Sequence, residues 1–407
     1  MTDLSLKNRY ELKELELNAL LEVTQAINNN VPEESLYKIY NFILRSNLNL
    51  KKLALYVYDN DWTCKVNFGT RNNYLAIKLP AVFHQVLEIT PVKQFDCNEF
   101  AEFDLVIPVA HKTQLLALVF IGDEHTETYH DHNDALRFIQ ALSNIIIVAI
   151  ENKKLARQQL QQEAFRKELE IARDVQQFLF PDKLPRTDRL HVEASYLPHD
   201  RIGGDYYDFI PINKNQFLFC VADVSGKGIP AALMMSNFQA SLRTLIRQTP
   251  NLREIVEALN YQVLENTKGE KFITFFGAIY DIELQSLLYV NAGHNPPLLV
   301  QNGSGLRWLQ EGSTVLGAMH PLPFINEGFI TNIRDFTIFC YTDGLTETVN
   351  EKGEEFGTDR LMSYFNDPAV RVKDLRSIHH DIIISLDAFK GSNGYHDDIT
   401  MLSVRVA

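Results

Sequence analysis

The chain reads Ala222-Asp-Val-Ser-Gly-Lys-Gly-Ile-Pro-Ala-Ala232 where an apolar run gives way to a helix through a glycine-rich turn. Residues 216–224 are almost all apolar and predict a buried strand. Pro230 favours the first turn of a helix, because its fixed φ suits that position and its missing N–H costs no hydrogen bond there. Asp223 therefore ends a strand beside glycines that permit a sharp turn. We expect its carboxylate at the rim of a sheet.

Three other acidic segments also fall where predicted strands end in tight turns: Gly203-Gly-Asp-Tyr-Tyr-Asp208, Tyr341-Thr-Asp-Gly344 and His396-Asp-Asp-Ile-Thr400. Any one of them alone reads more simply as an ordinary turn. Four within one domain favour a shared acidic site. Carboxylate oxygens suit Mg²⁺ or Mn²⁺ rather than zinc. Two such ions about 3.5–4 Å apart activate a water and hold a phosphate in two-metal hydrolases.

The elements around these turns predict a β-sandwich covered by helices over residues 186–407. Strands are expected at 192–197, 206–212, 216–224, 273–282, 286–291, 297–301, 336–341 and 399–406, and helices at 230–247, 252–267 and 372–389.

Two further stretches belong with these motifs: Asn291-Ala-Gly-His-Asn-Pro-Pro297, and the continuation of Tyr341-Thr-Asp-Gly344 through Leu-Thr-Glu347. Together the motifs resemble the metal-dependent protein phosphatase (PPM, type 2C) superfamily. More narrowly, residues 190–407 are similar to its bacterial SpoIIE/RsbU-like branch. The resemblance implies an αββα sandwich and two Mn²⁺ or Mg²⁺ ions. It also implies phosphoserine or phosphothreonine protein substrates, often anti-anti-sigma (STAS-type) partners.

The resemblance also implies roles for single residues. Asp223 would bridge both ions and the Val224 carbonyl would complete the coordination of one, while Asp343 and Asp397 would hold the other. Asp205 would belong to the same cluster. These four aspartates are the predicted catalytic residues.

Other polar residues in the motifs receive weaker assignments. Asp398 ranks below Asp397, and Asp208 is expected to support the site or form a turn. The wider superfamily has a histidine soon after the bridging aspartate, whereas this chain has Ser225-Gly226-Lys227, so the general acid is unassigned. His294 fits a structural turn better than a catalytic role, and Lys227 an exposed lysine better than a phosphate ligand.

Residues 1–152 predict an α+β domain, with two helices over 10–45 and strands at 53–58, 75–79, 105–110 and 115–121. Leu115-Leu-Ala-Leu-Val-Phe-Ile-Gly122, an acidic loop, and Ala141-Leu-Ser-Asn-Ile-Ile-Ile-Val-Ala-Ile-Glu-Asn152 resemble a GAF sensor domain. A PAS-like domain is an alternative. Such domains bind small molecules or dimerise, and no residue cluster nominates a ligand here.

Residues 153–185 predict a long helical linker, ended by Pro181. In a heptad register, the core positions are Val148, Leu155, Phe165, Leu169, Ala172 and Leu179, with Glu151, Gln158, Gln162 and Gln176 between them. So many polar core positions predict a weak, adjustable coiled coil and a homodimer. A single amphipathic helix lying on its own domain is the alternative.

Composition narrows the function further. The net charge of −13 argues against nucleic acid as a partner, and 45% hydrophobic with 22% charged residues is typical of a soluble globular protein. The four cysteines form no disulfide or zinc pattern. The N-terminus does not read as a signal peptide, and the longest apolar run is shorter than the ~20 residues of a membrane span. We expect a cytoplasmic protein.

The sequence therefore predicts a serine/threonine protein phosphatase regulated by an N-terminal sensor domain. The main alternative is a catalytically silent scaffold with the same fold, and the presence of all four aspartates counts against it. A GAF-coupled cyclase or kinase is disfavoured because no nucleotide-binding glycine loop occurs.

Overall fold

The computed structural model describes residues 2–46, 50–111, 114–122, 132–301 and 305–407. It divides into two compact units, Met1–Glu163 and Ala164–Ala407. Each unit is described by itself. The acidic loop after Gly122 lies outside the described residues.

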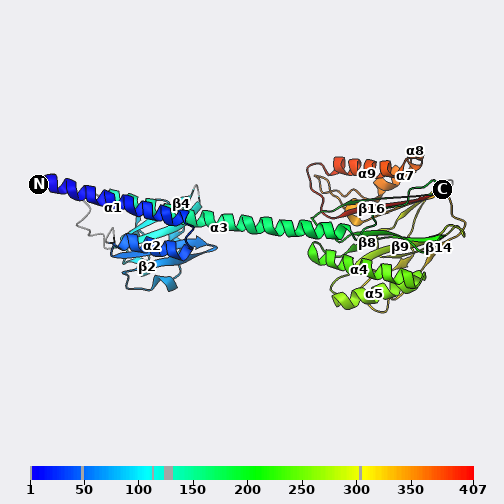
Figure 1. Ribbon diagram of the computed structural model, residues 1–407, viewed down its shortest axis with the longest axis horizontal. Helices are drawn as coiled ribbons and strands as arrows, with labels where there is room; N and C mark the ends of the chain where they lie inside the picture. The colour runs from blue at the N-terminus through cyan, green and yellow to red at the C-terminus, as the bar shows by residue number, and fades with distance from the viewer. Residues whose placement is uncertain (1, 47–49, 112–113, 123–131, 302–304) are drawn as a thin grey trace. The chain divides into compact units, whose positions relative to one another are not determined.

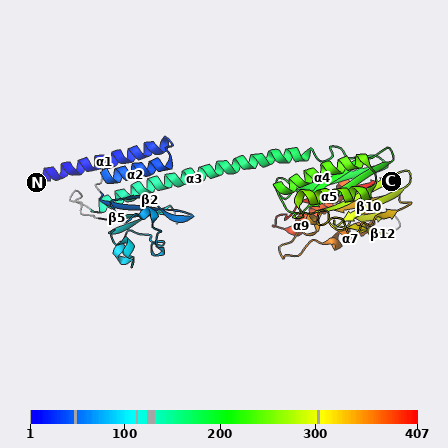
Figure 2. The same cartoon turned by 90° about the horizontal axis from the view of Figure 1, so that it is seen from below.

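The N-terminal unit is built on a five-stranded antiparallel sheet in the order β2-β1-β5-β4-β3. Three helices cover one face of this sheet (Figure 2), and their apolar side chains form a core with it. The elements are α1 (Thr2–Asn28), α2 (Glu33–Ser46), β1 (Lys52–Asp59), β2 (Asp61–Phe68), β3 (Thr90–Pro91), β4 (Leu105–His111), β5 (Gln114–Gly122) and α3 (His132–Gln177).

The opposite face of this sheet is covered by aromatic side chains carried on short 3₁₀ turns. The rings of Tyr74, Phe83 and Phe100 are buried there. The strand expected at 75–79 is one of these turns, η1 (Tyr74–Ala76), so that prediction is wrong. Tyr74 explains the difference, because its ring packs on Phe100 and its hydroxyl donates to the Glu99 carbonyl at 2.6 Å. These contacts hold the segment across the face of the sheet, where it pairs with no strand.

Helix α3 is continuous over 46 residues and has no glycine or proline inside it. By length and composition, the stretch Ala135–Gln177 could cross a membrane, and it is the one described helix that meets that test. Core helices of soluble proteins meet it too. Here the apolar residues Leu142, Ile146 and Ile147 are buried in the core of the N-terminal unit.

The C-terminal unit contains two sheets. One has the order β13-β10-β9-β8-β7 with β14 also on β10, and the other has the order β12-β11-β15-β16-β6. All described pairs are antiparallel except β10 with β13. The strands are β6 (Leu190–Leu197), β7 (Tyr206–Pro211), β8 (Gln216–Val224), β9 (Ile273–Asp281), β10 (Ser286–Ala292), β11 (Leu298–Gln301), β12 (Gly305–Trp308), β13 (Gly312–Ser313), β14 (Gly328–Ile330), β15 (Phe336–Tyr341) and β16 (Ile399–Val406).

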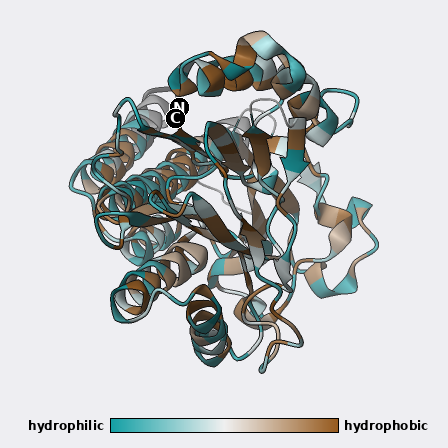
Figure 3. Ribbon diagram, turned by 90° about the vertical axis from the view of Figure 1, so that its right-hand side faces the viewer, coloured by the Kyte–Doolittle hydropathy of each residue, from teal (hydrophilic) through white to brown (hydrophobic). Residues whose placement is uncertain are grey.

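Helices cover both outer faces of this pair of sheets (Figure 1). The elements α4 (Ile229–Gln248) and α5 (Leu252–Thr267) lie on the first sheet, while α7 (Thr358–Asn366), α8 (Pro368–Arg371) and α9 (Leu375–Lys390) lie on the second. The short α6 (Asp343–Thr346) follows β15. One core lies between the sheets and one under each helical layer, so apolar residues concentrate on the strands (Figure 3). The arrangement is a four-layer αββα sandwich.

Candidate active site

The predicted acidic residues lie at strand ends contributed by both sheets. Asp223 is near the end of β8, and Asp205 immediately precedes β7, which pairs antiparallel with β8. Asp343 follows β15, and Asp397 precedes β16, which pairs antiparallel with β15. Because the end of one strand lies beside the start of its antiparallel neighbour, each sheet brings two acidic segments to one edge.

Burial and the neighbouring carboxylates together alter the ionisation of three of these residues. Burial raises the pKa of Asp223 to about 7, with further contributions from the negative charges of Asp343 and Asp397. Burial and then the charge of Asp223 raise the pKa of Asp205 well above its usual value. Burial and Asp397 raise the pKa of Asp343. The four predicted residues therefore share one region of concentrated negative charge.

Asp205 is held by hydroxyl groups that come from the other sheet. Its Oδ2 accepts hydrogen bonds from Thr342 Oγ1 at 2.8 Å and from Thr400 Oγ1 at 2.6 Å. The Thr400 N–H donates to Thr342 Oγ1 at 2.9 Å, which closes the network. Sequence reasoning missed both threonines as site residues, although each stands beside an aspartate motif.

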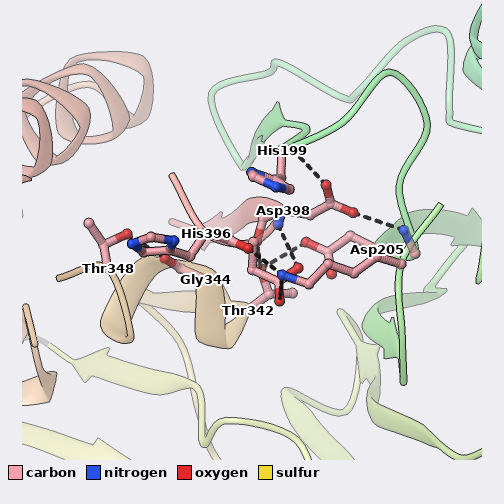
Figure 4. Close-up of polar contacts among 10 residues, drawn as sticks. His199, Asp205, Thr342, Gly344, Thr348, His396 and Asp398 are labelled. Carbon is pink, nitrogen blue, oxygen red and sulfur yellow. Dashed lines mark hydrogen bonds and ion pairs between the residues drawn. The ribbon is translucent and has the colours of Figure 1, made fainter. Parts of the chain in front are cut away.

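Asp398 binds backbone rather than projecting freely into the cluster (Figure 4). Its Oδ1 accepts from the His199 N–H at 2.8 Å, and its Oδ2 accepts from the Gly204 N–H at 2.8 Å. Asp398 therefore fixes the loop that leads into Asp205.

Lys227 forms an ion pair with Asp397, with 2.8 Å between Nζ and Oδ2. The same ammonium group donates to the His396 carbonyl. Both side chains of the pair are about half exposed. The lysine of the glycine-rich turn thus contacts a predicted metal ligand.

Asp208 joins α4 to β7. Its carboxylate is fully buried and accepts from Arg243 Nε at 2.7 Å and Nη2 at 3.0 Å, and also from the Tyr206 hydroxyl. Arg243 was not singled out from the sequence, because nothing local to α4 shows which strand it faces.

His294 lies in a buried turn after Gly293, whose φ of +69° suits glycine. The His294 N–H donates to Asn291 Oδ1 at 2.8 Å, and Nδ1 lies 2.9 Å from Thr274 Oγ1. Burial lowers its pKa to about 4, so the ring is neutral near pH 7.

Comparison with known proteins agrees with this geometry. Residues 213–407 match the family model described as stage II sporulation protein E (SpoIIE). The chain is 29% identical to the phosphoserine phosphatase RsbU of Bacillus subtilis over 246 residues, which span 60% of this chain and 71% of RsbU. Residues 213–407 are therefore similar to the SpoIIE/RsbU branch of the PPM protein phosphatases.

Other relatives share this domain to differing extents. Protein IcfG of Synechocystis is 26% identical over 73% of this chain and 51% of its own length. The phosphoserine phosphatase RsbP of B. subtilis is 26% identical over 45% of this chain and 46% of its own length. The SiaA-PP2C domain of Pseudomonas aeruginosa has the same fold, with a TM-score of 0.54 and 21% identity over 61% of this chain and 99% of that domain. This chain thus spans about half the length of IcfG and RsbP.

PPM phosphatases are metal-dependent, so the fit of this SpoIIE-type site to metal ions can be tested. Among the described residues, no three His, Cys, Asp or Glu side chains already converge closely enough to hold an ion. The donor chemistry does fit. All the candidate side chains offer only carboxylate oxygens, and their mutual repulsion is what a divalent cation neutralises. Asp223, Val224, Asp343 and Asp397 fall inside the family match, and Asp205 precedes it.

Proposed function

We propose that the chain is a metal-dependent phosphatase that removes phosphate from phosphoserine or phosphothreonine in a regulatory protein. One observation carries the proposal: four aspartates from the ends of two sheets share a single region of negative charge, and three of them lie inside the SpoIIE family match. The similarity to RsbU, a phosphoserine phosphatase, supports the same substrate class.

The site residues would divide into those that hold the metal ions and those that position the carboxylates. Asp223, the Val224 carbonyl, Asp343 and Asp397 would hold two Mn²⁺ or Mg²⁺ ions, with Asp205 beside them. When bound, such ions supply Lewis-acid activation of water and neutralise phosphate charge. Thr342 and Thr400 orient the Asp205 carboxylate through its Oδ2. Asp398 holds the loop before Asp205 in place.

The test is phosphate release from a phosphorylated STAS-type protein, with and without Mn²⁺. Asp223→Asn and Asp343→Asn should each lower kcat at least about 100-fold, because each removes a charged ligand. The exposed Asp188→Asn makes the same chemical change away from the site and should leave kcat unchanged. Hydrolysis near the wild-type rate by either site variant would reject the proposal.

The alternative of a silent scaffold gives a different result in the same assay. A scaffold would bind the phosphoprotein and release no phosphate at any Mn²⁺ concentration. Trapping partners on Asp223→Asn would then identify the bound protein in either case.

We propose that the protein is cytoplasmic and forms a homodimer. In this homodimer the N-terminal unit would regulate the phosphatase. A GAF-like domain is retained as the proposal for this unit, with dimerisation as its role. The signal would reach the site through α3. Just beyond α3, the Leu179 carbonyl accepts a hydrogen bond from the Gln239 amide of α4 at 3.2 Å, which anchors this end of the linker.

A further inference from the structure

Gln176, in the last turn of α3, makes a reciprocal pair of hydrogen bonds with one peptide unit. Its Nε2 donates to the Gly203 carbonyl at 2.8 Å, and the Gly203 N–H donates back to its Oε1 at 3.3 Å. The side chain is only 6% exposed. A primary amide is the side-chain group that donates and accepts in this way. Because the pair is buried, losing either partner would leave a polar group unsatisfied.

Gly203 lies in a tightly packed part of the carboxylate site. A Cβ on this residue would lie 2.1 Å from Asp398 Oδ2 and 2.1 Å from the Tyr196 hydroxyl oxygen, so no other residue fits without movement. The next N–H, from Gly204, donates to Asp398, and the residue after that is Asp205. Gln176 therefore fixes the backbone two residues before a carboxylate of the site.

The end of α3 has other anchors that do not touch this loop backbone. Phe180 is buried, with ring centroids 5.2 Å from Tyr196 and 4.9 Å from Tyr207. The Leu179 carbonyl accepts from Gln239 of α4. These contacts hold the helix end against the sheets and α4 of its own unit, so the fold does not depend on Gln176 alone.

We propose that Gln176 is a positioning residue that couples the end of the linker helix to the metal-binding carboxylates through Gly203. The proposal rests on the function proposed above, and it names how regulation reaches that site. A movement of the last turn of α3 pulls on the 203 peptide, and through it on Asp205 and on the loop that Asp398 holds.

The test measures Mn²⁺ binding by calorimetry in the full-length protein, together with the melting temperature without metal and the rate of phosphate release. Gln176→Leu keeps the volume and removes both hydrogen bonds. We expect its Kd for Mn²⁺ to rise about 10-fold. The Mn²⁺ concentration that gives half-maximal activity should rise in parallel.

Two further glutamines supply matched controls. Gln239→Leu also removes a hydrogen bond from a buried side-chain amide to the linker backbone, but Gln239 does not contact Gly203. This variant should therefore lower the melting temperature with little change in Mn²⁺ affinity. Gln177→Leu changes an exposed neighbour and should alter neither quantity. A purely stabilising role for Gln176 would make its leucine variant behave like Gln239→Leu.

The outcomes separate this inference from the proposed function. Unchanged Mn²⁺ affinity in Gln176→Leu, or a shift only in Gln239→Leu, overturns the coupling through Gly203. If Gln176→Leu does not fold, Gln176→Asn decides, because it keeps the amide but draws it back by one methylene; an unchanged Kd there overturns the inference too. A wild-type protein that binds Mn²⁺ but releases no phosphate contradicts the proposed function. In that case the Mn²⁺ affinities of wild type and Gln176→Leu still test whether Gln176 is coupled to the carboxylates.

Discussion

Lys227 places a positive charge against Asp397, which we propose binds metal. Its ammonium group competes with a divalent cation for that carboxylate, so Lys227→Met should tighten Mn²⁺ binding. Both partners are about half exposed, and exposed pairs contribute about 0–1 kcal/mol, so the gain should be no more than about fivefold. Calorimetry checks this, with the exposed Lys214→Met as the control. Weaker Mn²⁺ binding in Lys227→Met would show instead that the lysine supports the loaded site.

His379 makes the stability of the C-terminal unit sensitive to acid. The ring is buried between Ser195 Oγ, 2.9 Å from Nδ1, and Ser403 Oγ, 2.8 Å from Nε2. Burial, and then the nearby His191, lower its pKa to about 3. The unfolded chain, with a histidine pKa of about 6.5, binds this proton more readily. Stability from this residue is therefore present above pH 6.5 and is lost as the pH falls toward 3.

The contribution of His379 to the free energy of unfolding should be about 2 kcal/mol smaller at pH 5 than at pH 7. In His379→Gln this contribution disappears. The difference in unfolding free energy between wild type and variant should then shrink by about that amount between pH 7 and pH 5. Denaturant unfolding at both values measures it, with the exposed His380→Gln as the control. A difference that does not change with pH would contradict the assignment.

At the scale of elements, the Arg243–Asp208 pair fixes α4 against β7. Arg243→Leu leaves the Asp208 carboxylate buried without its cation, which costs about 3–5 kcal/mol. Arg247→Leu makes the same change four residues later on an exposed part of α4 and should cost less than about 0.5 kcal/mol. Urea unfolding distinguishes the two. A small loss for Arg243→Leu would mean that α4 is held mainly by its apolar contacts.

Several elements could be predicted from the sequence with their bounds. The strand β8 and the helix α5 match because an apolar run or a helical pattern is bounded there by turn residues. The 75–79 segment was mistaken for a strand, since so short an apolar run does not reveal that the preceding Tyr74 packs on distant phenylalanines. The local sequence indicates which residues are buried and the hydrophobic periodicity of the segment, but it does not indicate which distant residues the segment contacts.

The same distinction applies to the site. The aspartates stand out because they lie at strand ends, three of them near glycines and Asp397 beside a second aspartate. Their partners Thr342, Arg243 and Gln176 do not stand out, because their roles depend on contacts between segments distant in the chain. Gln176 is the clearest case: the sequence placed it in a helix–helix seam, and the structure buries it against Gly203.

At the scale of the whole molecule, that contact changes which face of the linker is free to dimerise. The predicted seam included Gln162, Gln176 and Leu179, but Gln176 contacts Gly203 and Leu179 packs on the core beneath α4 and α5. Leu155 and Phe165 of that seam stay exposed, at 48% and 55%, but a second set of apolar side chains is more exposed, namely Leu160, Ile171 and Val175, at 66%, 64% and 58%. At 3.6 residues per turn these three positions lie on one face, and Gln162 lies nearly opposite Ile171. We therefore expect the linkers of two chains to pair through Leu160, Ile171 and Val175.

Two substitutions that each add one negative charge separate these registers. Ile171→Glu places a carboxylate in each half of the expected interface and removes two buried isoleucines. Burying such a side chain contributes about 1.5–3 kcal/mol, so the dimer should weaken at least about 100-fold and appear monomeric at micromolar concentration. Gln162→Glu should leave the dimer intact. Light scattering on the full-length proteins measures both. A monomeric Gln162→Glu with a dimeric Ile171→Glu would favour the register expected from sequence. A monomeric wild type would show that no dimer forms and that α3 acts within a single chain.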